Sequence, residues 1–452
     1  MKYNTRSDML AREKIGRLLW KLSTPAIIGM MVHAFYNIVD TIFIGRFAGT
    51  LGIGGISIVF PIQMIIIATG ITIGIGGASV ISRRMGEGDQ EGASLALGNI
   101  IILSICCGLI CFLIGFIVLN PLLILFGANE ALLPYSRDYL SVILMGAPMI
   151  VFSMASNSAA RAEGNAKMAM NTMLLGGILN ILLDPVFIVV LGLGVKGAAI
   201  ATVISITVSC LFLIKYFLSG KSDLLLRLQY MRFRPDMARE IFAVGSSEFV
   251  RSVAMSLTSA IFNNTLRSIG GETPIAVFGI MFRVMSLFFM PIIGISQGAQ
   301  PIIGFNYGAK QHDRVRRGLL LANLSTTVIA LIGFLMFFVF SEFIFRIFSS
   351  DPELITIGKT ALRFFAVGLP LVGYQHISIS LFQALGKGRP ALFLTLARQV
   401  FFLIPMVLIL PRFFGLKGVW LSFPVTDVIS FFVTFSMVTY TIRNLHLVKG
   451  KA

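Results

Sequence analysis

Two aspartates lie inside long apolar stretches of the sequence, where a charged side chain is costly. Asp40 ends the segment YNIVD (36–40), and Asp184 stands in the segment NILLDP (180–185). A charge at the centre of a bilayer costs about 2.5–3.5 kcal/mol on insertion scales, and charges kept there usually have a function. Neither aspartate has a basic residue within one helical turn. Each has a polar residue four positions earlier, on the same helical face: Tyr36 for Asp40 and Asn180 for Asp184.

Two carboxylates in apolar surroundings suit a site that loads and releases a proton or a Na⁺ ion, and the residue types serve either ion. The alternative is that each is a structural aspartate, hydrogen-bonded at an interface between helices. The cost of placing both acids in the membrane favours a functional site.

The composition decides which kind of structure must position these acids. The chain has 452 residues, a mean hydropathy of +0.89 and 13% charged residues, whereas soluble domains are roughly a quarter charged. A membrane-spanning helix needs about 20 mostly apolar residues, and such runs fill most of the sequence. The alternating pattern of a membrane β-barrel is absent from the sequence. We therefore expect an all-α integral membrane protein.

The apolar runs predict twelve transmembrane helices. They lie near 16–44, 52–82, 95–120, 135–161, 168–191, 197–218, 242–267, 275–305, 317–341, 355–384, 390–411 and 419–442.

The basic residues are concentrated on alternate loops, as the positive-inside rule predicts for a multi-pass protein. Arg83 and Arg84 follow the second span, and the loop after the sixth span is the most basic. Lys2, Lys449 and Lys451 place the two ends on the same side. We expect a protein of the cell (plasma) membrane with both termini in the cytoplasm. The net charge of +17 is spread over short loops, so nucleic acid is not an expected partner.

The two halves of the sequence repeat each other at an offset of about 222 residues. GAP (146–148) returns as GLP (368–370), AEGNAK (162–167) as ALGKGR (384–389), and GVKG (194–197) as GLKG (415–418). With six spans in each half, both halves point the same way across the membrane. They should therefore be two six-helix lobes related by a pseudo-two-fold axis along the membrane normal. We expect an N-terminal lobe at 1–218, a cytoplasmic linker at 219–241 and a C-terminal lobe at 242–452.

The acids are not repeated with the scaffold. Phe262 takes the position of Asp40 in the second half, and Ile404 takes that of Asp184. This asymmetry favours a dedicated ion site in the first lobe over a symmetric structural role.

The second half has buried charges of its own. Arg283 and Asp427 are candidates either for an ion pair between helices or for substrate contacts. Glu248 and Arg251 are expected to pair locally and to reach toward the membrane surface. The single histidines of the spans are expected to pack or to line a cavity, since no metal-ligand spacing surrounds them.

Several segments resemble the multidrug and toxic compound extrusion (MATE) transporters, over essentially the whole chain. They are LSTP (22–25), YNIVD (36–40), SRRMG (82–86), RAEGN (161–165), LNILLDP (179–185) and GAAIAT (197–202). The resemblance is strongest to the bacterial and archaeal branch whose cation site lies in the N-terminal lobe.

This resemblance implies a secondary active antiporter that exports bulky, often cationic organic compounds in exchange for H⁺ or Na⁺. Asp40 and Asp184 would be the coupling carboxylates and the only place for a metal ion, as Na⁺. Pro25 would be a hinge, and Asn37 a candidate cavity residue together with Arg283 and Asp427. The polar network around the acids would consist of Asn180, Tyr36, Tyr139, Thr202 and Asn157, the last of which lies nearer the cytoplasmic end of its span.

Other functions stay open. A flippase for lipid-linked saccharides belongs to the same superfamily, but it usually needs several cationic side chains in its cavity. An intramembrane enzyme is not expected, because the sequence shows no histidine cluster, no nucleophile with a base and no phosphate-binding loop. We expect a monomer among membrane lipids that needs no cofactor besides the coupling ion.

Overall fold

The computed structural model describes residues 5–445, so Lys2, Lys449 and Lys451 lie outside the described residues. Over this range the chain forms helices joined by short turns, and no strand. The first lobe consists of α2 (Ile15–Phe47), α3 (Gly49–Glu87), α4 (Gln90–Ile117), α6 (Leu133–Met145), α7 (Ala147–Ala162), α8 (Ala166–Asp184) with the π-helical segment Pro185–Val190, and α9 (Gly194–Leu218). The second consists of α10 (Pro235–Gly270), α11 (Glu272–Gly308), α12 (His312–Val339), α14 (Pro352–Ala384), α15 (Gly388–Leu396) with the π-helical segment Ala397–Leu403, and α16 (Ile404–Arg443).

Twelve membrane crossings follow from these helices. Nine of the described helices are long and apolar enough to span a bilayer, and α6 and α7, bent by 54°, together make a tenth. The stretch Gly388–Arg443 counts once among the nine, but it breaks at Gly415 (φ 55°) and so provides two crossings. The remaining crossing is α10, whose polar residues lower its hydropathy. This confirms the expected all-α, twelve-helix plan.

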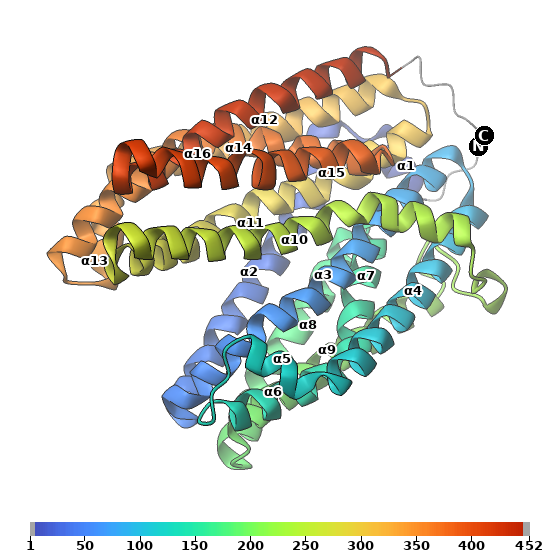
Figure 1. The fold of residues 1–452 in the computed structure, drawn as a ribbon. Coiled ribbons are helices and arrows are strands. Elements are labelled where there is room, and N and C mark those ends of the chain that lie inside the picture. The colour runs from blue at the N-terminus through green and yellow to red at the C-terminus, as the bar shows by residue number, and fades with distance from the viewer. Residues whose placement is uncertain (1–4, 446–452) are drawn as a thin grey trace.

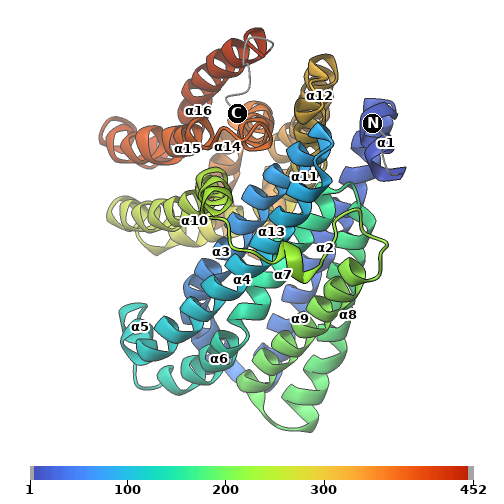
Figure 2. The same cartoon turned by 90° about the vertical axis from the view of Figure 1, so that its right-hand side faces the viewer.

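The crossings gather into two lobes that converge at one end of the molecule and diverge toward the other (Figure 1). Helices α2–α9 form the lobe drawn in blue and green, and α10–α16 form the lobe drawn in yellow-green to red. The amphipathic helix α1 (Thr5–Arg12) and the C-terminal end of α16 lie at the converging end, which we call the closed end (Figures 1 and 2). The short helices α5 (Leu119–Leu125) and α13 (Ser341–Phe348) lie at the diverging end, the open end.

The sequence repeats correspond to repeated backbone geometry. Gly164 and Gly386 both have the left-handed backbone, with φ of 89° and 73°. Gly194 and Gly415 likewise have positive φ, 53° and 55°. Glycine reaches this region without the steric penalty of a Cβ. Each lobe therefore turns at the same places because a glycine recurs there.

The linker is shorter than the range 219–241 expected from the sequence, because α10 already begins at Pro235. Proline fits the first turn of a helix, where its missing N–H is not needed. The linker is attached to the first lobe, since Asn99 of α4 donates to the carbonyl of Arg232 at 3.1 Å and accepts from the N–H of Arg234 at 2.9 Å.

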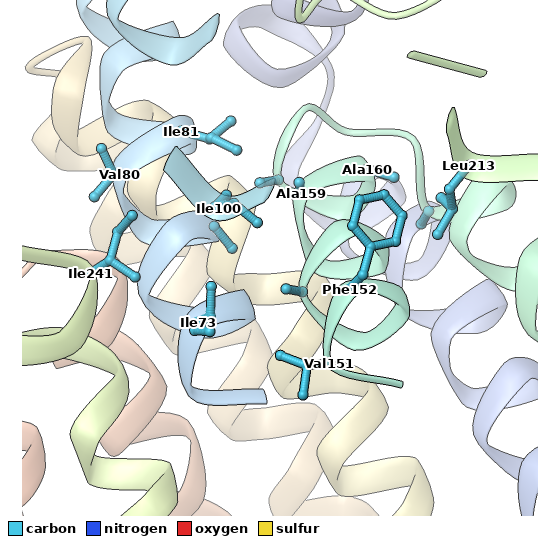
Figure 3. Close-up of a cluster of buried hydrophobic side chains, with 14 of the residues drawn as sticks. Ile73, Val80, Ile81, Ile100, Val151, Phe152, Ala159, Ala160, Leu213 and Ile241 are labelled. Atoms are coloured by element: carbon cyan, nitrogen blue, oxygen red, sulfur yellow. The ribbon is translucent and has the colours of Figure 1, made fainter. Parts of the chain in front are cut away.

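At the closed end the lobes approach each other through glycines. A Cβ at Gly76 of α3 would lie 1.9 Å from the carbonyl oxygen of Ile241 in α10, and a Cβ at Gly245 would lie 1.9 Å from that of Thr72. Behind this seam, Ile73 and Ile100 belong to the buried core of the first lobe (Figure 3). The seam is thus a close backbone contact supported by a well-packed wall.

Candidate ion-coupling site and central cavity

The two membrane aspartates lie on neighbouring helices of the first lobe. Asp40 belongs to the part of α2 nearer the open end, and Asp184 is the last residue of α8, which packs against α2. Asp184 is fully buried and Asp40 is 9% exposed. In the described part of the chain, neither carboxylate has an ion-pair partner. The two are close enough to interact electrostatically.

The local sequence gives α8 an unusual end at Asp184. Pro185 has no N–H and cannot continue the α-helical hydrogen bonding. The chain continues instead as the π-helical segment Pro185–Val190. Such π segments are rare and often accompany functional sites. Asp184 therefore sits at a change of backbone geometry.

Asn180 connects the acid to the next helix. Its side-chain nitrogen lies 3.3 Å from a carboxylate oxygen of Asp184 and 3.4 Å from the hydroxyl of Thr202 on α9. Tyr139 of α6 and Tyr36 of α2 lie within electrostatic range of both acids. The structure thus brings four of the polar residues predicted from the resemblance around the two carboxylates.

Three oxygen atoms of this cluster have no hydrogen-bond partner among the residues that the structure describes. They are Oδ1 of Asp40, Oδ2 of Asp184 and Oδ1 of Asn180. A buried polar atom without a partner costs about 1–3 kcal/mol. A proton on a carboxylate or a hard cation between the oxygens would satisfy these atoms, so the cluster fits H⁺ or Na⁺.

Two predicted residues make no hydrogen bond to the acids within residues 5–445. Asn157 donates to the carbonyl of Ala169 at 2.9 Å and accepts from Arg161, so its hydrogen bonds fix α7 to α8. Asn37 is exposed and donates to the carbonyl of His33 on its own helix at 2.7 Å. Neither asparagine shares a hydrogen bond with Asp40 or Asp184.

A cavity of about 320 Å³ lies between the lobes, beside the acid cluster. Tyr36, Asn180 and Thr202 line it, whereas Asp40 and Asp184 are not among its described lining residues. The polar neighbours of the acids are therefore part of the cavity wall. A change of ion at the carboxylates would reach the cavity through these side chains.

The second lobe contributes charged residues to the same cavity, and here one expectation from the sequence is wrong. Arg251 pairs with Glu248 at 2.5 Å, as expected for neighbours on one helix. The pair does not reach toward the membrane surface, because both residues line the central cavity together with His376 and Gln383. Gln383 donates to Glu248 at 3.1 Å.

The ion pair considered between Arg283 and Asp427 does not form. Asp427, only 1% exposed, pairs instead with Arg398 at 2.8 Å. Arg283 is exposed and has no ion-pair partner in the described chain. The sequence shows Arg398 inside a span, but spacing along one chain does not show which helix faces Asp427.

The position equivalent to Asp40 has a different use in the second lobe. Phe262 is fully buried and stacks on Phe278 and Phe423, with ring centroids 5.1 and 4.8 Å away. No group of three or more metal-ligating side chains occurs within residues 5–445. The carboxylate of Asp40 therefore has no counterpart at the equivalent position of the second lobe.

Comparison with known families identifies this arrangement. The MatE family model matches residues 25–186 and 249–409, one stretch in each lobe and most of the chain together. The chain belongs to the MatE family. As a MatE protein it is a membrane transporter and not an enzyme.

Relatives of this MatE protein match it over nearly the full length of both chains. The multidrug export protein MepA of Staphylococcus haemolyticus is 30% identical over 430 residues, which cover 95% of this chain and 94% of that protein. A solved MOP superfamily transporter from Pyrococcus furiosus superposes with a TM-score of 0.93 at 29% identity, over 99% of this chain and all of the other. A MATE family transporter solved in the outward-facing conformation gives a TM-score of 0.92 at the same identity and coverage.

Proposed function

We propose that this MatE protein is a secondary active antiporter that exports bulky, often cationic organic compounds in exchange for H⁺ or Na⁺. The observation that carries the proposal is the pair of buried carboxylates, Asp40 and Asp184, which lack ion-pair partners in the described chain and have no equivalent in the second lobe. Export of drugs is supported by the names of relatives such as MepA.

The orientation follows from charge. The closed end carries the basic residues Arg83, Arg161 and Arg314, so it is the cytoplasmic end by the positive-inside rule. Both termini then lie in the cytoplasm of a cell-membrane protein, and the cavity faces outward. We infer a monomer surrounded by lipid, with no nucleic-acid partner.

We propose that ion binding at the acids is coupled to the shape of the cavity by the residues that belong to both the ion cluster and the cavity wall. An ion at Asp40 and Asp184 would draw the unsatisfied oxygens of α2 and α8 together. Tyr36 and Asn180 would move with them and reshape the cavity wall. Pro25 lies inside α2, between the start of that helix at Ile15 and Asp40, where it is placed to act as the hinge.

The alternative is a flippase for lipid-linked saccharides, whose phosphates need free cationic side chains. Both arginines that line the central cavity are largely engaged: Arg161 donates to Asn157 and to Ser158, and Arg251 pairs with Glu248 and keeps only its Nη1 group for a ligand. The described lining of this cavity therefore lacks the several free cationic side chains that a pyrophosphate needs, which favours organic cargo over a lipid pyrophosphate. Flipping of a labelled undecaprenyl lipid in proteoliposomes would establish the alternative.

The deciding experiment is efflux of ethidium from proteoliposomes under an imposed pH gradient or an imposed Na⁺ gradient, one at a time. Asp40→Asn and Asp184→Asn should each abolish gradient-driven efflux without changing membrane abundance. Asp138→Asn is the matched control, because Asp138 is an exposed acid of the same lobe next to Tyr139. Efflux that persists in both site variants would refute the coupling role.

A further inference from the structure

A second cavity, of about 300 Å³, lies within the C-terminal lobe. It adjoins the central cavity, because Arg251, Ile293 and His376 line both. Its volume is at the lower end of the range for small-molecule sites. We call it the C-lobe pocket.

The wall of the C-lobe pocket is aromatic and rich in methionine. Phe262 and Phe423 stack in its wall, and Phe365 meets Phe423 edge-on with 5.1 Å between ring centroids. Met255 and Met285 also line it. Aromatic faces favour a flat ring, and methionine adapts its shape to different ligands.

The charged groups on this wall all have one sign. Arg251 and Arg398 line the C-lobe pocket, and no acidic side chain of the described chain does. Neither of their acids lines this pocket: Glu248 lines the central cavity, and Asp427 is 1% exposed. Among the charged groups of the described chain, a ligand in the pocket therefore meets the two guanidinium groups.

Each guanidinium has hydrogen-bonding capacity left over. Arg251 uses Nε and Nη2 on one oxygen of Glu248, and Arg398 uses the same two atoms on Oδ1 of Asp427. The Nη1 group of each has no hydrogen-bond partner in the part of the chain that the structure describes. Gln375, 3% exposed, adds an acceptor: its nitrogen donates to the carbonyl of Asp427 at 2.8 Å, while its Oε1 has no partner there.

We propose that the C-lobe pocket binds organic carboxylates with an aromatic body. The ring lies against the phenylalanines, and the carboxylate accepts charge-assisted hydrogen bonds from the free N–H groups of Arg251 and Arg398. An ammonium group in the same place would face two guanidinium groups and no acidic side chain of the described lining. The inference rests on the proposed transport function and adds a second, anion-accepting ligand site in the C-terminal lobe beside the central cavity.

The test compares three probes that share one ring system: 2-naphthylacetate, 2-naphthylethanol and 2-naphthylethylamine. Binding to the purified full chain in detergent is measured by isothermal titration calorimetry. The carboxylate should bind at least about tenfold more tightly than the alcohol or the amine, since a hydrogen bond to a charged group is worth about 1.5–3 kcal/mol. Equal affinities, or tighter binding of the amine, would overturn the proposal.

The variant Arg398→Gln/Asp427→Asn removes the guanidinium without leaving a lone buried charge. It should lose the preference for naphthylacetate. The matched control is Arg267→Gln/Glu272→Gln, an exposed pair of the same lobe 3.5 Å apart, which should keep that preference. Unchanged preference in the folded Arg398 variant would overturn the proposal.

Two further variants keep the result interpretable. Met255→Trp fills the pocket without altering its charges and should weaken binding of all three probes; full retention would place the site elsewhere. Asp40→Asn should keep naphthylacetate affinity while losing gradient-driven efflux. Failure of ion coupling therefore appears in the efflux measurement, whereas failure of carboxylate binding appears in the affinity for naphthylacetate.

Discussion

Asn180 and Asp184 lie one turn apart on α8, with 3.3 Å between the amide nitrogen and a carboxylate oxygen. The same nitrogen lies 3.4 Å from Thr202, which ties α8 to α9. The amide oxygen and the second carboxylate oxygen have no partner in the described chain. The pair is thus held in place by donors while its acceptors remain available to an ion.

Asn180→Ala should shift the ion dependence of efflux, in a direction that depends on the ion. It removes the only hydrogen bond that the described residues give to Asp184, and such a bond to a charged group is worth about 1.5–3 kcal/mol. Because that bond stabilises the ionised carboxylate, its loss favours protonation, and the H⁺ concentration for half-maximal efflux should fall by about ten- to a hundredfold. A Na⁺ ion instead loses the amide oxygen as a ligand, so the Na⁺ concentration for half-maximal efflux should rise. Efflux from proteoliposomes at graded pH or Na⁺ concentration measures this. Asn171→Ala, on an exposed position of the same helix, should behave like the wild type; an unchanged midpoint in Asn180→Ala would contradict the role.

Pro25→Ala should stabilise the protein and slow transport. Pro25 is buried inside the continuous helix α2, and a proline there removes one helical hydrogen bond at a cost of up to about 3 kcal/mol. Alanine restores the bond and stiffens α2 between Ile15 and Asp40. Thermal unfolding in detergent should shift upward while the efflux rate falls. Pro352→Ala, at the first turn of α14 where proline is tolerated, should leave the efflux rate unchanged; wild-type efflux by Pro25→Ala would exclude the hinge.

The sequence predicts the membrane plan well, because lipid imposes a strict rule on every span. Apolar runs between polar breaks predict the twelve crossings, including the more polar α10, since backbone groups in a bilayer must be satisfied within helices. The repeats also correspond in three dimensions: Gly164 and Gly386, and Gly194 and Gly415, have positive φ at equivalent turns. A turn with positive φ favours glycine, so a glycine that recurs at the same offset marks such a turn in the sequence.

What the sequence does not predict depends on which helix faces meet. The partner of Asp427 is Arg398, on a segment of the lobe that no spacing rule selects. Glu248 and Arg251 pair as neighbours, yet whether they face lipid or the cavity depends on how α10 packs against α3. Such contacts are set by the tertiary arrangement rather than by local pattern.

Gly245→Ala should open the closed end. A Cβ there would lie 1.9 Å from the carbonyl oxygen of Thr72, so the lobes must separate at a cost of about 1–3 kcal/mol. Arg83 and Glu240 contact each other across the same seam at 2.7 Å. Cysteines introduced at these two positions, in a background without the native cysteines, should cross-link less efficiently once Ala replaces Gly245, and efflux should fall. Gly279→Ala is the matched control, because a Cβ at that position meets nothing within 4 Å; equal cross-linking in the two variants would contradict the prediction.

Glu163 lies directly after α7 at the closed end and is fully buried in a cluster of hydrogen-bonded polar groups. It accepts from Tyr216, from Ser222 at 2.7 Å and from the N–H of Asp223 at 2.9 Å, and it pairs with Arg6 at 3.3 Å. Burial, partly offset by these donors and by Arg6, raises the pKa of Glu163 from 4.5 to about 7. These contacts join α1 and the linker to the helices α7 and α9 of the first lobe.

This shift predicts how the stability of the protein depends on pH. The folded state holds the Glu163 proton up to about pH 7, whereas the unfolded chain releases it above a pH of about 4.5. Stability from this group is therefore present at low pH and is lost as the pH rises through that window. The melting temperature of the wild type should fall more steeply between about pH 4.5 and 7 than that of Glu163→Gln, which has no carboxyl to titrate. Glu87→Gln, at an exposed position, should keep the wild-type slope; parallel curves for the wild type and Glu163→Gln would show that the buried carboxyl does not titrate in this range.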